Sequence, residues 1–183
     1  MKKKVKDYKP AYLIIRYLIL LGLTFSLPLI YLIFTPMTIY PSAKLLSLFY
    51  KIAIYENIIV INSTTFIQII PACVAGSAYL LLLILNLSIP MKLKKRVQSI
   101  LFSFILLLTI NILRISVLSG WYHKNMLFFD FTHAFFWYVL STIFVIFIWL
   151  LIIKIFLIKE IPFYTDFRYL ILPQEILGFQ ANE

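Results

Sequence analysis

The sequence predicts an all-α integral membrane protein, built as a bundle of about four transmembrane helices. Two observations support this prediction. Of the 183 residues, 63% are hydrophobic and only 13% are charged, which leaves too few polar side chains to cover a water-soluble globule. Several apolar runs are also long enough to cross the roughly 30 Å of hydrocarbon in a bilayer, which takes about 20 helical residues.

Four apolar runs reach this length and define a single transmembrane domain over residues 1–160. They cover residues 11–34, 71–89, 97–119 and 133–158. The first run is longer than the core of a signal peptide and is not followed by a small-residue cleavage site, so we expect a retained span. Residues 161–183 alternate charged and apolar positions, and we expect them to form a cytoplasmic tail.

Lysine and arginine cluster beside the ends of these runs, and the clusters predict the orientation of the chain. They comprise Lys2, Lys3, Lys4, Lys6 and Lys9; Lys92, Lys94, Lys95 and Arg96; and Lys154, Lys159 and Arg168. With four spans, all three clusters lie on one side, which the positive-inside rule places in the cytoplasm together with both chain ends. We therefore expect a multi-pass protein of the cell membrane, whose net charge of +10 reflects topology and not nucleic-acid binding.

Residues 45–61 are apolar but are interrupted by Lys51, Glu56 and Asn57. A fifth span here would move the basic loop at residues 92–96 to the outer side, so we place the segment at the outer interface. The alternative of an inserted segment stays open. The runs IIVI (58–61) and TFIQII (65–70) flank the turn-prone Asn62 and Ser63, and this pattern predicts a short β-hairpin against the outer membrane surface.

Three chemically capable side chains are expected at the outer ends of three different spans. Cys73 lies near the start of the second span, which runs inward. Arg114 lies 18 residues beyond Arg96, which corresponds to about 27 Å of helix from the inner face. His133 begins the fourth span, and His123 lies in the preceding loop. The topology therefore predicts one polar site at the outer surface.

Cys73 is the only cysteine, which excludes an intramolecular disulfide, a CxxC redox pair and a Cys-rich metal site. No cofactor or metal is predicted. Pro71 suits the first position of a helix, so Cys73 would lie in the first turn, where the positive end of the helix dipole and a nearby arginine favour the thiolate. The small residues Ala72, Ala75, Gly76 and Ala78 allow either close helix packing or a substrate beside the sulfur.

Each candidate residue also has a structural interpretation. A lone cysteine in an apolar run is commonly an inert packing residue, and a histidine at the end of a span can be a hydrogen-bonded interfacial residue. Arg114 can extend toward the outer headgroups. However, an arginine inside an apolar span costs about 2.5 to 3.5 kcal/mol on insertion scales and usually faces a polar partner, and Asn111 lies one turn earlier on the same helix face.

Three motifs follow one another in the chain: PACVAG around Cys73, NILRI around Arg114 and FDFTHAF around His133. Over about residues 57–150, this order resembles the exosortase and archaeosortase family of membrane transpeptidases. The resemblance implies that Cys73 is the nucleophile, that Arg114 stabilises the oxyanion and that His133 is the acid and base, with His123 as its substitute.

The resemblance also implies a function. Such an enzyme cleaves C-terminal sorting signals, which consist of a short motif, a membrane span and a basic cluster, from exported proteins through a thioester. It then joins the new carboxyl end of the exported protein to an acceptor, for which lipid and water are the candidates. The implied partners are these signals and the lipid bilayer, and no nucleic acid. A non-catalytic membrane subunit or assembly factor is the alternative, whereas a serine protease using Ser119 and a channel have less support.

Overall fold

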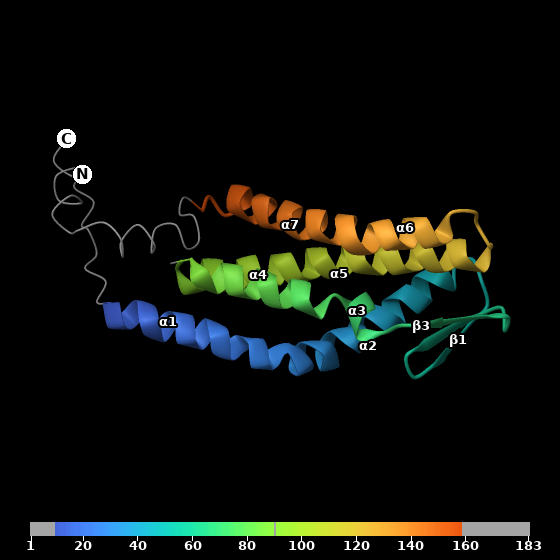
Figure 1. Cartoon of the computed structure of the whole chain (residues 1–183), viewed down its shortest axis with the longest axis horizontal. Coiled ribbons are helices and arrows are strands. Elements are labelled where there is room, and N and C mark those ends of the chain that lie inside the picture. Colours follow the sequence, from blue (N-terminus) through green and yellow to red (C-terminus); the bar gives the residue numbers. More distant parts are fainter. Residues whose placement is uncertain (1–9, 90, 159–183) are drawn as a thin grey trace.

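The computed structural model describes residues 10–89 and 91–158, which form an elongated bundle of helices with a small sheet at one end (Figure 1). The predicted all-α membrane fold is confirmed. The helical elements are α1 (Pro10–Gly22), a 3-10 turn (Leu23–Ser26), α2 (Leu27–Leu46), α3 (Pro71–Val74), α4 (Gly76–Ser88), α5 (Leu93–His123), α6 (Phe129–Phe135), a π-helix (Phe136–Leu140) and α7 (Ser141–Ile155).

Three helical stretches are long and apolar enough to cross a membrane: Tyr17–Leu46, Leu93–His123 and Phe129–Ile155. Helix α4 is a shorter apolar helix. The first stretch extends well beyond the expected end at residue 34, although Pro36 and Pro41 lie inside it. A helix that crosses lipid satisfies its own main-chain groups, so it persists through prolines that would end it in water.

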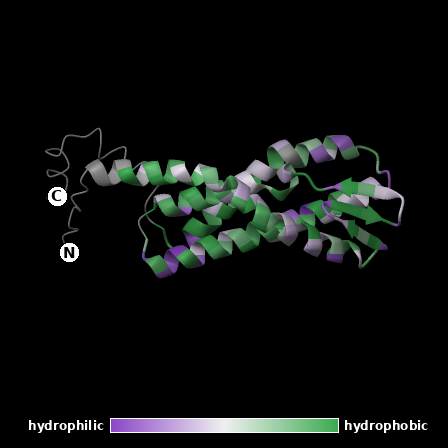
Figure 2. Cartoon of the chain, turned by 90° about the horizontal axis from the view of Figure 1, so that it is seen from below, coloured by the Kyte–Doolittle hydropathy of each residue, from purple (hydrophilic) through white to green (hydrophobic). Residues whose placement is uncertain are grey.

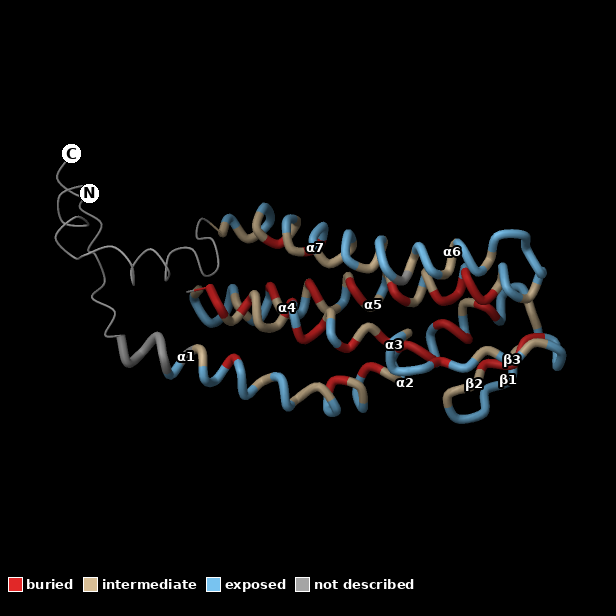
Figure 3. Tube along the Cα trace, in the orientation of Figure 1, coloured by how far each residue is buried: buried red, intermediate tan, exposed pale blue. Residues whose placement is uncertain are grey.

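The outer surfaces of the helices are apolar, as a membrane-spanning protein requires. Figure 2 shows hydrophobic residues along most of the bundle, with hydrophilic residues gathered at the start of α5 and at the end that carries the sheet. In Figure 3 the buried residues line the inward faces, whereas α6 and α7 present largely exposed outer faces. Large exposed side chains such as Leu32 and Tyr138 would therefore contact lipid.

The expectation of one continuous helix over residues 71–89 is wrong, because the helix is broken at Ala75. This residue adopts the left-handed conformation, with φ 61° and ψ 37°. Cys73 consequently lies in the single turn of α3, and α4 begins anew at Gly76. A single turn sums few peptide dipoles, so the expected support of a thiolate by a long helix dipole is largely lost.

The sheet contains β1 (Ile52–Tyr55), β2 (Ile58–Ile61) and β3 (Thr65–Gln68), paired antiparallel in the order β1-β2-β3. The predicted hairpin is present as β2 and β3, with Ile61 opposite Thr65. Asn62 and Ser63 in its turn have positive φ values, which short polar residues tolerate. Residues 45–61 therefore comprise the end of α2 and two strands, and they do not form a fifth helix.

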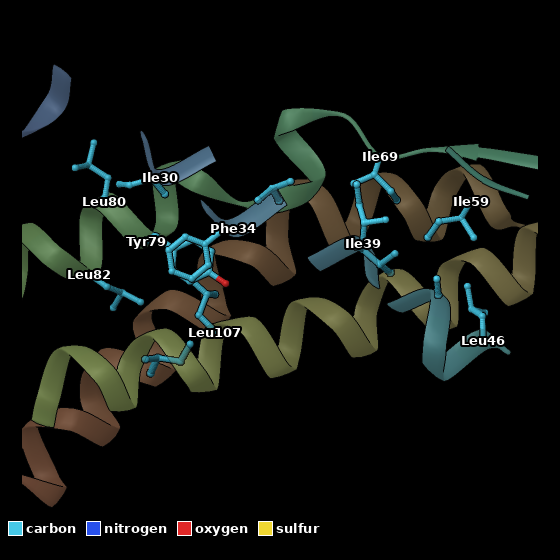
Figure 4. Close-up of a cluster of buried hydrophobic side chains, with 14 of the residues drawn as sticks. Ile30, Phe34, Ile39, Leu46, Ile59, Ile69, Tyr79, Leu80, Leu82 and Leu107 are labelled. Atoms are coloured by element: carbon cyan, nitrogen blue, oxygen red, sulfur yellow. The ribbon is translucent and has the colours of Figure 1, made fainter. Parts of the chain in front are cut away.

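The core lies between α2, α4 and α5. Phe34 and Tyr79 stack with ring centroids 3.9 Å apart (Figure 4). Phe104 meets both rings edge to face. Gly76 allows α4 to approach α2, because a Cβ atom at this position would lie less than 3.0 Å from the Tyr31 ring. The small residue after the break thus serves close packing of α4 against α2.

Candidate active site

A cavity of about 230 Å³ lies where β3, α3, α5 and α6 meet. Cys73, Arg114 and His133, which come from three different helices, all line it. The remaining lining residues are Phe66, Ile67, Gln68, Ile69, Ile115, Leu118, Ser119, Tyr122, Phe129 and Phe136. The three side chains therefore lie around one cavity, as the sequence predicts, and most of the other residues that line this cavity are apolar.

The main-chain carbonyl of Cys73 is the centre of a hydrogen-bond network. Arg114 Nη2 donates to this oxygen over 3.0 Å, and Asn111 Nδ2 donates to it over 2.9 Å. In an unbroken helix the carbonyl would accept the N–H four residues later. The break at Ala75 disrupts that pattern, and the two side chains of α5 supply donors. Arg114 therefore turns inward and does not extend to the headgroups.

The other side of the Arg114 guanidinium is held by α7. Arg114 Nη1 donates to Ser141 Oγ over 3.0 Å, and this hydroxyl donates to the carbonyl of Phe136 over 2.8 Å. Phe136 begins the π-helix that joins α6 to α7, and such irregular turns frequently occur at functional sites. Sequence reasoning missed Ser141, since a single serine in an apolar span gives no distinguishing signal.

The Cys73 thiol is free and half-buried. The guanidinium of Arg114 lines the same cavity as this thiol. Among residues 10–89 and 91–158, no three His, Cys, Asp or Glu side chains gather to hold a metal ion. The chemistry that these lining residues offer is nucleophilic attack, proton transfer and stabilisation of an anion.

The two histidines have different surroundings. His133 lies on α6, lines the cavity and stacks on Phe129 with ring centroids 5.6 Å apart. His123 ends α5 and packs its ring against Tyr50 at 5.0 Å. The distinction favours His133 over His123 as the residue that can reach a substrate in the cavity.

Both ring nitrogens of His123 are engaged by the sheet. Nε2 lies 3.2 Å from Asn62 Nδ2, and Nδ1 lies 2.8 Å from Thr65 Oγ1. This pattern fits a neutral ring in which Nε2 accepts from the amide and the N–H at Nδ1 donates to the hydroxyl. His123 therefore connects the end of α5 to the turn between β2 and β3, which is a structural role.

Comparisons with known proteins do not add to this description. No family model, no curated protein and no solved structure matches the chain.

Proposed function

We propose that the chain is a membrane-embedded cysteine transpeptidase of the exosortase type, which cleaves C-terminal sorting signals from exported proteins and transfers the new carboxyl ends of these proteins to an acceptor. The observation that supports this proposal best is the convergence of Cys73, Arg114 and His133 on one cavity. These residues lie 41 and 19 positions apart in sequence, so no local packing requirement brings them together.

In the proposed reaction, the Cys73 thiolate attacks the carbonyl carbon of the scissile peptide bond. A C–S bond forms, the electron pair of the carbonyl moves to its oxygen, and collapse of this intermediate breaks the C–N bond and leaves a thioester. The leaving amine, which carries the anchoring span of the substrate, takes a proton. An acceptor hydroxyl, amine or water molecule then attacks the thioester and restores the thiolate.

Arg114 is the proposed stabiliser of the oxyanion. A guanidinium has five N–H groups, and the bonds to Cys73 and Ser141 engage Nη2 and Nη1, which leaves further donors for the substrate oxygen. One positioned donor of this kind typically contributes about 3 to 4 kcal/mol to the stability of the transition state. The two existing bonds would keep the guanidinium fixed before the substrate arrives.

His133 is the proposed general acid and base, because it lines the same cavity. It would protonate the leaving amine in the first half of the reaction and take a proton from the acceptor in the second half. Phe129, stacked on its ring, would hold the imidazole in position.

The orientation of the chain follows from charge. Lys92, Lys94, Lys95 and Arg96 lie at the start of α5, and the cavity residue Arg114 lies about 27 Å further along the same helix. The positive-inside rule then puts the cavity at the outer face of the cell membrane. The proposed position of both chain ends in the cytoplasm concerns residues 1–9 and 159–183, which lie outside the described residues.

Replacement of the nucleophile tests this proposal. In cells that produce the Cys73→Ala chain, proteins that end in a motif, a span and a basic cluster should keep their C-terminal segments. Peptide mass spectrometry of membrane fractions would detect these segments. A Cys73→Ser chain at the same protein level is a matched control for size and polarity. Normal removal of the segments in the Cys73→Ala cells would refute the assignment of the nucleophile.

A non-catalytic membrane subunit is the second candidate function. It is favoured by the bonds from Arg114 and Asn111 to the Cys73 carbonyl, because these bonds would hold α3 in any case. Thiol labelling distinguishes the two functions. An activated Cys73 should react with iodoacetamide at neutral pH much faster than a model thiol, and a packing cysteine should react more slowly.

A further inference from the structure

We propose that the free edge of β3 binds the substrate as an additional antiparallel or parallel strand and so presents its scissile bond to Cys73. This inference rests on the proposed function and deepens it, because it names the form in which the substrate is recognised: an extended, uncharged peptide held by its main chain. Addition of a strand to an exposed sheet edge is a common mode of peptide recognition.

The pairing of the strands shows which main-chain groups are available. The N–H of Ile69 donates to the carbonyl of Asn57 over 2.8 Å, so residues 69, 67 and 65 form the hydrogen-bonded pairs with β2 in the observed register. Phe66 and Gln68 alternate with them and direct their N–H and C=O groups away from β2. Among the described residues, no hydrogen bond from elsewhere occupies these groups.

The cavity lies along the free edge of β3 and does not lie over a face of the sheet. Four consecutive residues, Phe66 to Ile69, line it, although their side chains alternate between the two faces. No residue of β2 is among the lining residues, whereas a cavity over one face would also contact the neighbouring strand. A peptide in the cavity would therefore lie beside the main chain of β3.

The two edges of the sheet differ in how they are protected. The outer edge of β1 is flanked directly by Lys51 and Glu56, and charges of this kind discourage pairing with another strand. The segment over residues 64–69, TTFIQI, contains no charge and no proline. The unprotected edge is thus the one that leads into the catalytic cavity.

The position of β3 also connects recognition with chemistry. Only Ile69, Ile70, Pro71 and Ala72 separate the strand from Cys73, and the cavity extends from the strand to the thiol. A peptide paired with Phe66 and Gln68 would continue past the sulfur, with Arg114 on the other wall. Main-chain pairing would fix the distance between the substrate backbone and the thiol. Substrates with different amino-acid sequences could therefore bind in the same way.

The experiment measures binding without catalysis. The full chain carrying Cys73→Ala is placed in lipid nanodiscs, and binding of a fluorescent, end-capped hexapeptide of alternating valine and threonine is followed by fluorescence polarisation. The test variant is Gln68→Pro, which removes one outward N–H group and leaves the pairs with β2 intact. We expect its affinity to be about tenfold weaker, as for the loss of one main-chain hydrogen bond.

Two matched controls distinguish the loss of the N–H group at the edge of β3 from a general disturbance of the sheet. Ile54→Pro removes an outward N–H group at the opposite edge, since the bond from Asn62 to Lys51 places Ala53 and Tyr55, not Ile54, in the hydrogen-bonded pairs. Gln68→Ala keeps the N–H group and changes only the side chain. The Ile54→Pro chain should bind the hexapeptide within about twofold of the parent chain, and Gln68→Ala should weaken binding less than Gln68→Pro does.

A measurement on the peptide covers the case in which Gln68→Pro does not fold. Hexapeptides N-methylated at alternate residues are compared on the chain with an unaltered edge, and one of the two alternating sets should bind at least about tenfold more weakly. Absence of saturable binding by the unmodified hexapeptide, or equal binding by both methylated sets, would overturn the proposal. Since this chain has no nucleophile, its result is independent of the cellular test of catalysis.

Discussion

Helix α5 carries one arginine in its first turn and another nine residues before its end, and the two arginines make the same kind of contact. Arg96 Nη2 donates to the carbonyl of Ile89 over 2.9 Å, just beyond the end of α4. Arg114 Nη2 donates over 3.0 Å to the carbonyl of Cys73, at the broken end of α3. In both places the guanidinium satisfies a carbonyl at the end of a helix.

The surroundings of the two arginines differ. Near Arg96, Asn86 and Ser99 are fully buried and hydrogen-bonded to each other, and the Asn86 amide also donates to Leu82. Near Arg114, a thiol, an imidazole and an irregular helix surround a cavity. A polar group inside an apolar bundle therefore does not by itself indicate function. The open volume and the reactive neighbours distinguish the two ends.

The largest expected effect concerns the histidines inside and outside the cavity. His133→Gln should lower the rate of signal removal by about 10² to 10⁴, because it removes the proposed proton donor. His123→Gln should leave the rate within about twofold and lower the thermal unfolding midpoint, since it disturbs the contacts with Asn62 and Thr65. Processing kinetics in nanodiscs measure both. The reverse order of rates would make His123 the acid and base.

The next largest effect is expected from substitution of Arg114, with Arg96 for comparison. Arg114→Lys keeps the charge but loses the fork that holds Cys73 and Ser141, so we expect a rate lower by about 10² to 10³. Arg96→Lys is the matched control at the other end of α5 and should leave the rate unchanged. Equal rates for the two variants would mean that Arg114, like Arg96, only caps the end of a neighbouring helix and has no role in the reaction.

The smallest effect tests the break itself. Ala75 has a positive φ, so Ala75→Gly should relieve strain and stabilise the protein by about 1 kcal/mol. In a continuous helix the same change would destabilise by roughly 0.5 to 1 kcal/mol. The thermal unfolding midpoint in detergent therefore gives opposite signs for the two backbones. A lower midpoint would mean that residues 71–88 form one helix and that the Cys73 carbonyl is not released.

The sequence was sufficient for the fold class and for the grouping of the site residues. Length and hydropathy predict spans, and the rise of a helix places Cys73, Arg114 and His133 at one level. The hairpin is predictable because Asn62 and Ser63 separate two β-branched runs. Strand β1 is not, because Lys51 and Glu56 interrupt its pattern, and only pairing with β2 shows that the segment is a strand.

Other features depend on tertiary contacts that no local pattern encodes. Alanine is the strongest helix former, so nothing in the sequence marks Ala75 as a break. On one side of this residue Gly76 packs against Tyr31, and on the other side the Cys73 carbonyl accepts hydrogen bonds from α5. The choice between the histidines also required the structure, because both lie close to the outer end of the last predicted span, and only the bonds of His123 to the sheet assign it a structural role.

In the proposed reaction, Cys73 forms a covalent intermediate in this cavity. Intact-protein mass spectrometry of the chain, purified from cells that contain its substrates and quenched in acid, tests it most directly. We expect an added peptide or protein mass on Cys73 that neutral hydroxylamine removes, and no such mass on the Cys73→Ala chain. Continued removal of sorting signals without any hydroxylamine-sensitive adduct on Cys73 would contradict it.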